Sequence, residues 1–340
     1  MTGKLTSLQV LRFLAALGVV QAHAALVFGH DSNEFGAIGV DVFFVISGFI
    51  ITGAARSAPQ RFLQNRAVRV LPLYYLFLAP WLLSVICFGH LEWRELVASV
   101  FLWPALDVYS TPYLLVGWTL CYELLFYLGV WLILRGVRGR YLIAAYVVAV
   151  AMAALTGAMV WRYLGSPLIA EFLFGVVLAF WRPSKPWLGA VALASGVAAV
   201  VWFAFAVDGG IELIHYAAPG GWLRPIVWGI PAALLVFGAI QLEPLFKSPL
   251  TVPLVFLGDA SYSLYLSHLY TNAALLSFGV HPPPTLAILV CVVVGAGVYA
   301  FIERPLLRLV RGALKQAGET RSGRRIATGA LSGAPDPAAS

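Results

Sequence analysis

Long apolar runs follow one another along almost the whole sequence, and they constrain its fold more than any other feature. A helix that crosses the hydrocarbon core of a bilayer needs about 20 mostly apolar residues. Runs of this kind occupy residues 5–28, 38–56, 70–89, 113–134, 141–161, 167–182, 187–207, 223–241, 253–278 and 284–303. Only 11% of the residues are charged and 61% are hydrophobic, which excludes an ordinary soluble domain. We therefore predict an all-α, polytopic membrane protein with about ten transmembrane helices.

The distribution of lysine and arginine predicts how these helices are oriented. If the predicted helices alternate in direction, all of the 22 lysines and arginines except Arg94, Arg162 and Arg224 fall on one side of the membrane. The positive-inside rule assigns that side to the cytoplasm and places both termini there. The net charge of +7 therefore reflects membrane topology, and it gives no reason to expect a nucleic-acid partner.

Three segments fall outside the predicted spans. Residues 90–104 are short and amphipathic, which is typical of a helix that lies along the membrane interface. Residues 311–340 are rich in Gly, Ala, Ser, Pro and Arg, which predicts a disordered cytoplasmic tail after a membrane-embedded domain of residues 1–310. Residues 207–222 form an outer loop with four candidates to line a sugar site: Asp208, Glu212, His215 and Trp222.

Ionisable side chains inside the apolar runs are the first candidates for function. A charged residue at the centre of the bilayer costs about 2.5–3.5 kcal/mol on insertion scales, so such residues are rarely kept without a role. The intramembrane set is Arg12, His23, Asp41, Glu123, Glu171, Asp259 and His268. No group of His, Asp and Glu within it has metal-ligand spacing on one helix, so we expect no metal.

Arg12 and His23 share one face of the first predicted helix. The turn between them is about 1100°, or about 20° more than three full turns, and the rise is about 16 Å. Asp41 begins the second span at a similar depth, and Gly36, Gly39 and Gly48 of the same stretch permit close helix approach. A carboxylate next to His23 orients it as a general base. The alternatives are a structural Asp–His pair, and a snorkelling Arg12 above a hydrogen-bonded His23.

Three arginines precede the third span. Arg61, Arg66 and Arg69 lie in the stretch RFLQNRAVRVLP. One interpretation is positive-inside topology or contact with anionic lipid. The other is a site for a phosphate-bearing cytosolic ligand, because guanidinium groups bind phosphate through paired hydrogen bonds.

Two further spans each carry one candidate. Glu123 lies deep in an apolar, aromatic helix, where it either pairs with a cation or stays protonated. His268 lies in the outer half of residues 253–278, and it is the rival of His23 for any acid–base role. The alternative for His268 is a hydrogen-bonded packing residue.

These motifs, taken in order, resemble the family-3 membrane acyltransferases, which O-acylate bacterial surface polysaccharides. The resemblance rests on Arg12-x10-His23, GVDVFFVISGF, Arg66-x2-Arg69 before LPLYY, GWTLCYE, EFLFG, LGDASYSLYLSH and IERP. The motifs extend over residues 5–310, nearly the whole chain. Within the family, the sequence is most similar to the exopolysaccharide-production acetyltransferases.

The resemblance implies an enzyme, an O-acetyltransferase of the bacterial inner membrane that depends on acetyl-CoA. It implies a cytoplasmic acetyl-CoA donor and a saccharide or polysaccharide hydroxyl as acceptor, with a polysaccharide-assembly complex as a further partner. The implied catalytic residues are His23, Glu123 and Asp41, and the implied donor-binding residues are Arg12, Arg66 and Arg69. Trp118 and His268 are candidate substrate-binding residues.

The sequence leaves the mechanism and one other class of function open. His23 acts either as a general base in direct transfer or as a nucleophile that forms an acetyl-histidine. The alternative function is a transporter or exporter of a saccharide or small solute, with Asp41, Glu123 and His23 as a proton relay. A third alternative is a non-catalytic member of a polysaccharide-assembly complex.

Overall fold

The computed structural model describes residues 5–29, 35–103, 112–181, 185–206, 221 and 223–316. These residues form helices and turns, and none of them forms a strand, so the predicted all-α class is confirmed. The α-helices are α1 (Thr6–Phe28), α2 (Ile38–Ser57), α3 (Phe62–Phe88), α4 (Trp93–Phe101), α5 (Trp118–Leu134), α6 (Gly139–Thr156), α7 (Met159–Leu164), α8 (Leu168–Phe180), α9 (Pro186–Ala206), α11 (Ile230–Gln241), α12 (Val252–Asp259), α13 (Ser261–Ser277) and α14 (Pro284–Val298).

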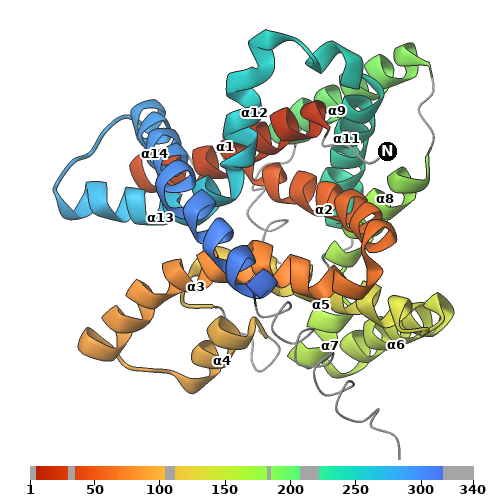
Figure 1. Ribbon diagram of the computed structural model, residues 1–340, viewed down its shortest axis with the longest axis horizontal. Helices are drawn as coiled ribbons and strands as arrows, with labels where there is room; N and C mark the ends of the chain where they lie inside the picture. Colours follow the sequence, from red (N-terminus) through yellow and green to blue (C-terminus); the bar gives the residue numbers. More distant parts are fainter. Residues whose placement is uncertain are drawn as a thin grey trace, which may run out of the picture.

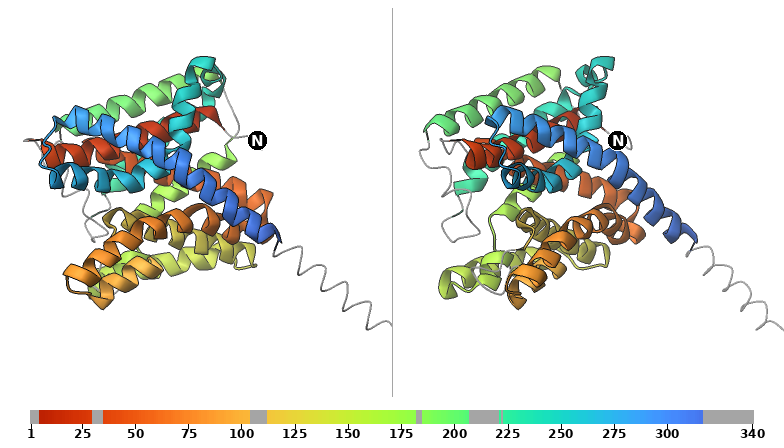
Figure 2. Two further views of the ribbon diagram at one scale, coloured as in Figure 1. Left: turned by 60° about the vertical axis from the view of Figure 1, so that its left-hand side comes forward. Right: turned by 90° about the vertical axis from the view of Figure 1, so that its left-hand side faces the viewer.

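The helices form two groups that α2 and α8 join (Figures 1 and 2). One group contains α1, α9, α11, α12, α13 and the first part of α14, and the other contains α3 to α7. α2 packs against α1 in the first group and α5 in the second, and α8 packs against α11 and α5. α1 has a central position, since it packs against α2, α12, α13 and α14. Side chains of α1 therefore reach several other helices.

Eight helical segments among the described residues are long and apolar enough to cross a membrane, which agrees with a multi-pass membrane protein. They are Thr6–Phe28, Ile38–Ser57, Pro59–Phe88, Leu115–Leu134, Gly139–Thr156, Met159–Phe180, Pro186–Phe203 and Pro284–Gln316. The last segment is α14 with its continuation through the π-helical turn Tyr299–Glu303 and residues 304–316. The other two predicted spans correspond to shorter helices.

The predicted span 253–278 is divided at Ala260 into α12 and α13, and 223–241 begins with the π-helical turn Pro225–Gly229 before α11. The prediction also began the third helix too late. α3 starts at Phe62 and so carries Arg66 and Arg69 on a regular helix. Most of the predicted tail, residues 317–340, lies outside the described residues, and so does nearly all of the loop 207–222, including its four candidate sugar-binding residues.

Glycines of α2 bring this helix into backbone contact with its neighbours, as the sequence predicted. A Cβ atom on Gly39 would lie 2.1 Å from the carbonyl oxygen of Ala15 on α1. A Cβ on Gly48 would lie 2.0 Å from the carbonyl oxygen of Phe172 on α8. Both distances are far inside van der Waals contact, so only glycine permits this spacing. The two contacts fix α2 between α1 and α8.

Candidate active site

His23 is oriented by the backbone of its own helix. Its Nδ1 atom lies 2.9 Å from the carbonyl oxygen of Val19, one turn earlier on α1. A carbonyl oxygen only accepts hydrogen bonds, so Nδ1 carries the proton and donates it. The Nε2 atom of the neutral ring then keeps its lone pair, which is the form that a general base needs.

His268 of α13 lies against His23. The centroids of the two imidazole rings are 4.9 Å apart, with an angle of 64° between the ring planes. The His268 side chain is completely buried, and neither ring nitrogen has a hydrogen-bond partner of normal geometry among the described residues. The structure thus brings together the two histidines that the sequence treated as rivals.

Among the described residues, Asp41 is hydrogen-bonded to Arg224 and not to His23, in contrast to the predicted pairing. The Nε and Nη2 atoms of Arg224 donate hydrogen bonds to its two carboxylate oxygens, at 2.9 and 3.1 Å. Glu171 approaches the same guanidinium, with Oε1 at 4.0 Å from Nε. All three residues are at most 1% exposed. The physical reason is charge balance: a buried guanidinium requires a carboxylate at its own depth, and Asp41 is that carboxylate.

Trp118, a candidate substrate-binding residue, lies beside this cluster. Its ring centroid is 6.0 Å from the guanidinium carbon of Arg224. That distance is at the outer limit of a cation–π contact. The structure therefore places Trp118 next to the Asp41–Arg224–Glu171 cluster rather than next to the paired histidines.

Glu123 is held by hydroxyl groups. Ser47 of α2 donates to its Oε1 atom at 3.1 Å, and Tyr127, one turn further along α5, donates to the same atom at 2.6 Å. Among the described residues, no hydrogen bond joins Glu123 or Asp41 to His23. Neither carboxylate that the sequence proposed as an orienter of His23 takes that place.

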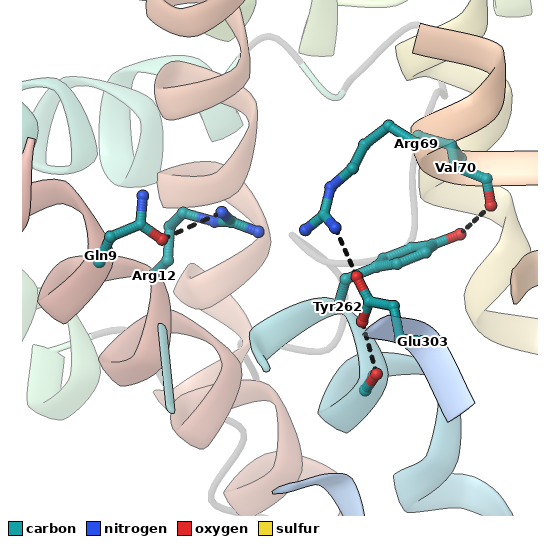
Figure 3. Close-up of polar contacts among 7 residues, drawn as sticks. Gln9, Arg12, Arg69, Val70, Tyr262 and Glu303 are labelled. Atoms are coloured by element: carbon teal, nitrogen blue, oxygen red, sulfur yellow. Dashed lines mark hydrogen bonds and ion pairs between the residues drawn. The ribbon is translucent and has the colours of Figure 1, made fainter. Parts of the chain in front are cut away.

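Arg12 and Arg69 point toward each other from α1 and α3 (Figure 3). Gln9 of α1 accepts a hydrogen bond from Arg12 at 3.3 Å. Arg69 forms an ion pair with Glu303 in the π-helical turn after α14, and Ser263 donates a hydrogen bond to the other oxygen of that carboxylate at 2.6 Å. Two of the three predicted donor-binding arginines therefore converge, and a glutamate that is 1% exposed holds one of them in place.

Arg66, the third donor-binding candidate, lies one turn before Arg69 on α3. Its side chain is partly buried, and its Nε atom is buried without a hydrogen-bond partner among the described residues. Arg12 and Arg69 thus converge from α1 and α3, and Arg66 follows on α3 one turn away from Arg69 with an unpaired Nε atom among the described residues. Such a set is suited to a ligand with several phosphate groups.

Sequence reasoning did not give Glu303 or Arg224 a role at the site. Glu303 lay within the motif IERP, but the arginine that it pairs with is 234 positions away. Arg224 was noted only as an outer-side cation, although it joins Asp41 across 183 positions. The available signal was charge matching by depth, since each intramembrane carboxylate and arginine requires an opposite charge at its own level.

A comparison with known proteins assigns the class. Residues 5–303 match the family described as acyltransferase domain. The chain belongs to this family: it is a multi-pass membrane enzyme that transfers acyl groups. The family resemblance predicted from the sequence motifs is confirmed.

Particular relatives come from rhizobia. The chain is 34% identical over 322 residues to exopolysaccharide production protein ExoZ of Rhizobium meliloti (strain 1021), covering 87% of this chain and 97% of that protein. It is 27% identical over 367 residues to nodulation protein 10 of Rhizobium leguminosarum bv. viciae, covering 91% of this chain and 95% of that protein. No solved structure matches the chain.

Proposed function

We propose that this enzyme moves an acetyl or other short acyl group from acyl-CoA to a hydroxyl of an exopolysaccharide or lipid-linked saccharide. The donor binds from the cytoplasm, where both termini lie, and the enzyme resides in the bacterial inner membrane. The relative ExoZ is named for exopolysaccharide production, which supports a polysaccharide acceptor. A polysaccharide-assembly complex as a further partner is part of this proposal.

One observation carries the proposal: α1 presents two different chemistries on one face. Near its start, Arg12 points toward Arg69 (Figure 3). About 16 Å further along the helix, His23 meets His268. An acyl-CoA molecule has a phosphate-rich end and a thioester end joined by a thin arm, and this arrangement offers cations to the first and a base to the second.

The arginines have the properties of a phosphate-binding set. Arg12, Arg66 and Arg69 supply planar donor groups, and an arginine forms stronger and more directional hydrogen bonds to phosphate than a lysine does. Glu303 neutralises part of the positive charge of the arginines. It also fixes the side chain of Arg69, so less conformational entropy is lost when the donor binds.

The transfer step uses the lone pair of His23 Nε2. This atom takes the proton of the acceptor hydroxyl while the hydroxyl oxygen attacks the carbonyl carbon of the thioester. The carbon–sulfur bond then breaks, coenzyme A leaves as a thiolate, and the imidazolium returns the proton to that sulfur. Base assistance of this kind contributes about 10²–10⁴-fold to a rate.

A proton-relay transporter, the alternative function, needs His23, Asp41 and Glu123 to exchange protons. The hydrogen bonds of Asp41 lead to Arg224, and those of Glu123 lead to Ser47 and Tyr127. This geometry favours the enzyme.

The test compares cells that lack the gene with cells that carry either the wild type or His23→Ala. Surface glycans are analysed by mass spectrometry for ester-linked acyl groups, and the purified full-length proteins are incubated with labelled acetyl-CoA. We expect the wild type to bind acetyl-CoA and to acylate the glycan, and His23→Ala to bind it but lose acylation by about 10²–10⁴-fold.

The matched control is His281→Ala, because His281 is exposed and lies between α13 and α14, outside the histidine pair. It should acylate like the wild type. Wild-type acylation by His23→Ala contradicts the role of His23. Failure of the wild type to bind acetyl-CoA contradicts the donor assignment.

A further inference from the structure

Helix α13 carries a buried polar stripe next to His23. His268 is 0% exposed and Asn272 is 2% exposed. The two residues are four positions apart, so they lie on the same face of α13, one turn from each other. The His268 end of this stripe is the part that meets the ring of His23.

Three polar atoms of these two side chains lack a hydrogen bond of normal geometry among the described residues. Neither Nδ1 nor Nε2 of His268 has a hydrogen bond of normal geometry among the described residues, although the backbone of Leu264 and Tyr265 lies nearby, and the side-chain amide nitrogen of Asn272 has none either. The amide oxygen of Asn272 does have a partner, since it accepts from the thiol of Cys291 at 3.3 Å. Roughly 90% or more of buried polar groups in native proteins are hydrogen-bonded, so unpaired atoms beside a base indicate a place where a polar ligand binds.

We propose that His268, with Asn272 one turn away, binds the acceptor hydroxyl that His23 deprotonates. A hydroxyl has one donor and two acceptor positions. It donates its proton to His23 Nε2 and accepts hydrogen bonds from the imidazole N–H of His268 and from the amide of Asn272. Rings with centroids 4.9 Å apart can each place a nitrogen about 3 Å from one shared oxygen. This inference rests on the proposed function.

The chemistry of the stripe favours a neutral alcohol over an anion. The group that meets His23 here is the imidazole of His268, and the amide of Asn272 lies one turn further along the same face of α13. Both are uncharged donors. The arginines suited to phosphate belong to the other end of α1. The substrate class at this end is therefore a saccharide hydroxyl.

The test uses His268→Leu in the full-length protein, because leucine fills similar space without polar atoms. Removing unpaired polar atoms does not weaken a buried contact, so the unfolding temperature should equal or exceed that of the wild type. Binding of labelled acetyl-CoA should stay unchanged. Acylation of the surface glycan should fall about tenfold to a hundredfold, as expected for a lost hydrogen bond to the reacting oxygen. Asn272→Leu should behave in the same direction with a smaller loss.

His281→Leu is the matched control, and it should change none of the three measurements. His268→Gln keeps an amide donor, so it should recover part of the acylation, and it carries the test if the leucine variant does not fold. Wild-type acylation by a folded His268 variant overturns the inference, and so does a loss of acetyl-CoA binding in parallel with acylation. If the wild type itself neither binds acetyl-CoA nor acylates glycan, the proposed function fails instead.

Discussion

The buried cluster of Asp41, Arg224 and Glu171 allows a quantitative prediction. Arg224 donates two charge-assisted hydrogen bonds to Asp41, at 2.9 and 3.1 Å. Each is worth about 1.5–3 kcal/mol, so their loss amounts to roughly 3–6 kcal/mol. That range agrees with the cost of about 3–5 kcal/mol for removing one member of a buried ion pair.

Because Glu171 also lies near Arg224, replacing Asp41 and replacing Arg224 should have different costs in the free energy of unfolding. Because Glu171 Oε1 lies 4.0 Å from Arg224 Nε, Asp41→Asn leaves the cation with one carboxylate. Arg224→Gln leaves two carboxylates without a cation. We therefore expect Asp41→Asn to lower the free energy of unfolding by about 3 kcal/mol and Arg224→Gln by about 5 kcal/mol. The double variant should cost less than the sum of the two.

The assay measures the free energy of unfolding in mild detergent for the two single variants and the double variant, together with acylation per folded molecule. Folded Asp41→Asn should keep most of its activity, because Asp41 is hydrogen-bonded to Arg224 and not to His23. A variant that is as stable as the wild type and yet inactive would refute this reasoning, since Asp41 would then act in the chemistry. If the free-energy cost of the double variant equals the sum of the two single costs, the pairing of Asp41 with Arg224 is refuted.

Three further predictions follow from single contacts. Glu243 accepts hydrogen bonds from the first two backbone N–H groups of α1, each at 2.9 Å. Glu243→Ala should therefore lower the free energy of unfolding by about 1–2 kcal/mol and speed amide hydrogen exchange at the start of α1. Glu243→Gln should lower the free energy of unfolding less. Glu303→Gln should raise the KM for acyl-CoA about five- to tenfold with little change in kcat, because it loosens Arg69 without touching the base; an unchanged KM would contradict a positioning role. Gly48→Ala should cost about 1–3 kcal/mol, because its Cβ meets a carbonyl of α8 at 2.0 Å. Gly53→Ala on the same helix, where a Cβ meets nothing within 4 Å, should be neutral, and equal costs at the two glycines would contradict the close packing.

The helical architecture was predictable because a bilayer leaves few alternatives. Apolar runs of sufficient length must be helical, since every backbone N–H and C=O must be paired inside the helix. The break at Ala260 was not predicted, because the apolar residues on both sides of it give one continuous run. Next to the break, α12 packs closely against α1: a Cβ on Gly258 would lie 2.0 Å from the carbonyl oxygen of Gln9. The polar sequence Asp-Ala-Ser at 259–261 was the available local signal.

At the site, periodicity placed Arg12 and His23 on one helix face, but it did not identify their partners. Helical spacing relates residues on the same helix, whereas His268 reaches His23 from another part of the chain. The glycines of this stretch correctly indicated close neighbours for α2: Gly39 meets the backbone of α1, and Gly48 meets the backbone of α8. The depth of an ionisable side chain in the membrane limits which residues can be its partner. Among those residues, the one of opposite charge becomes the partner.

Charge balance also explains why a carboxylate does not orient His23. In a low-dielectric interior an arginine without a counter-ion costs far more free energy than a neutral imidazole with an imperfect hydrogen bond. The carboxylates Asp41 and Glu303 are therefore taken by Arg224 and Arg69. A neutral histidine needs only a fixed tautomer, and the carbonyl oxygen of Val19 provides one. In the proposed reaction, His23 becomes charged only when it takes the proton of the acceptor hydroxyl, so it needs no permanent ion pair inside the membrane.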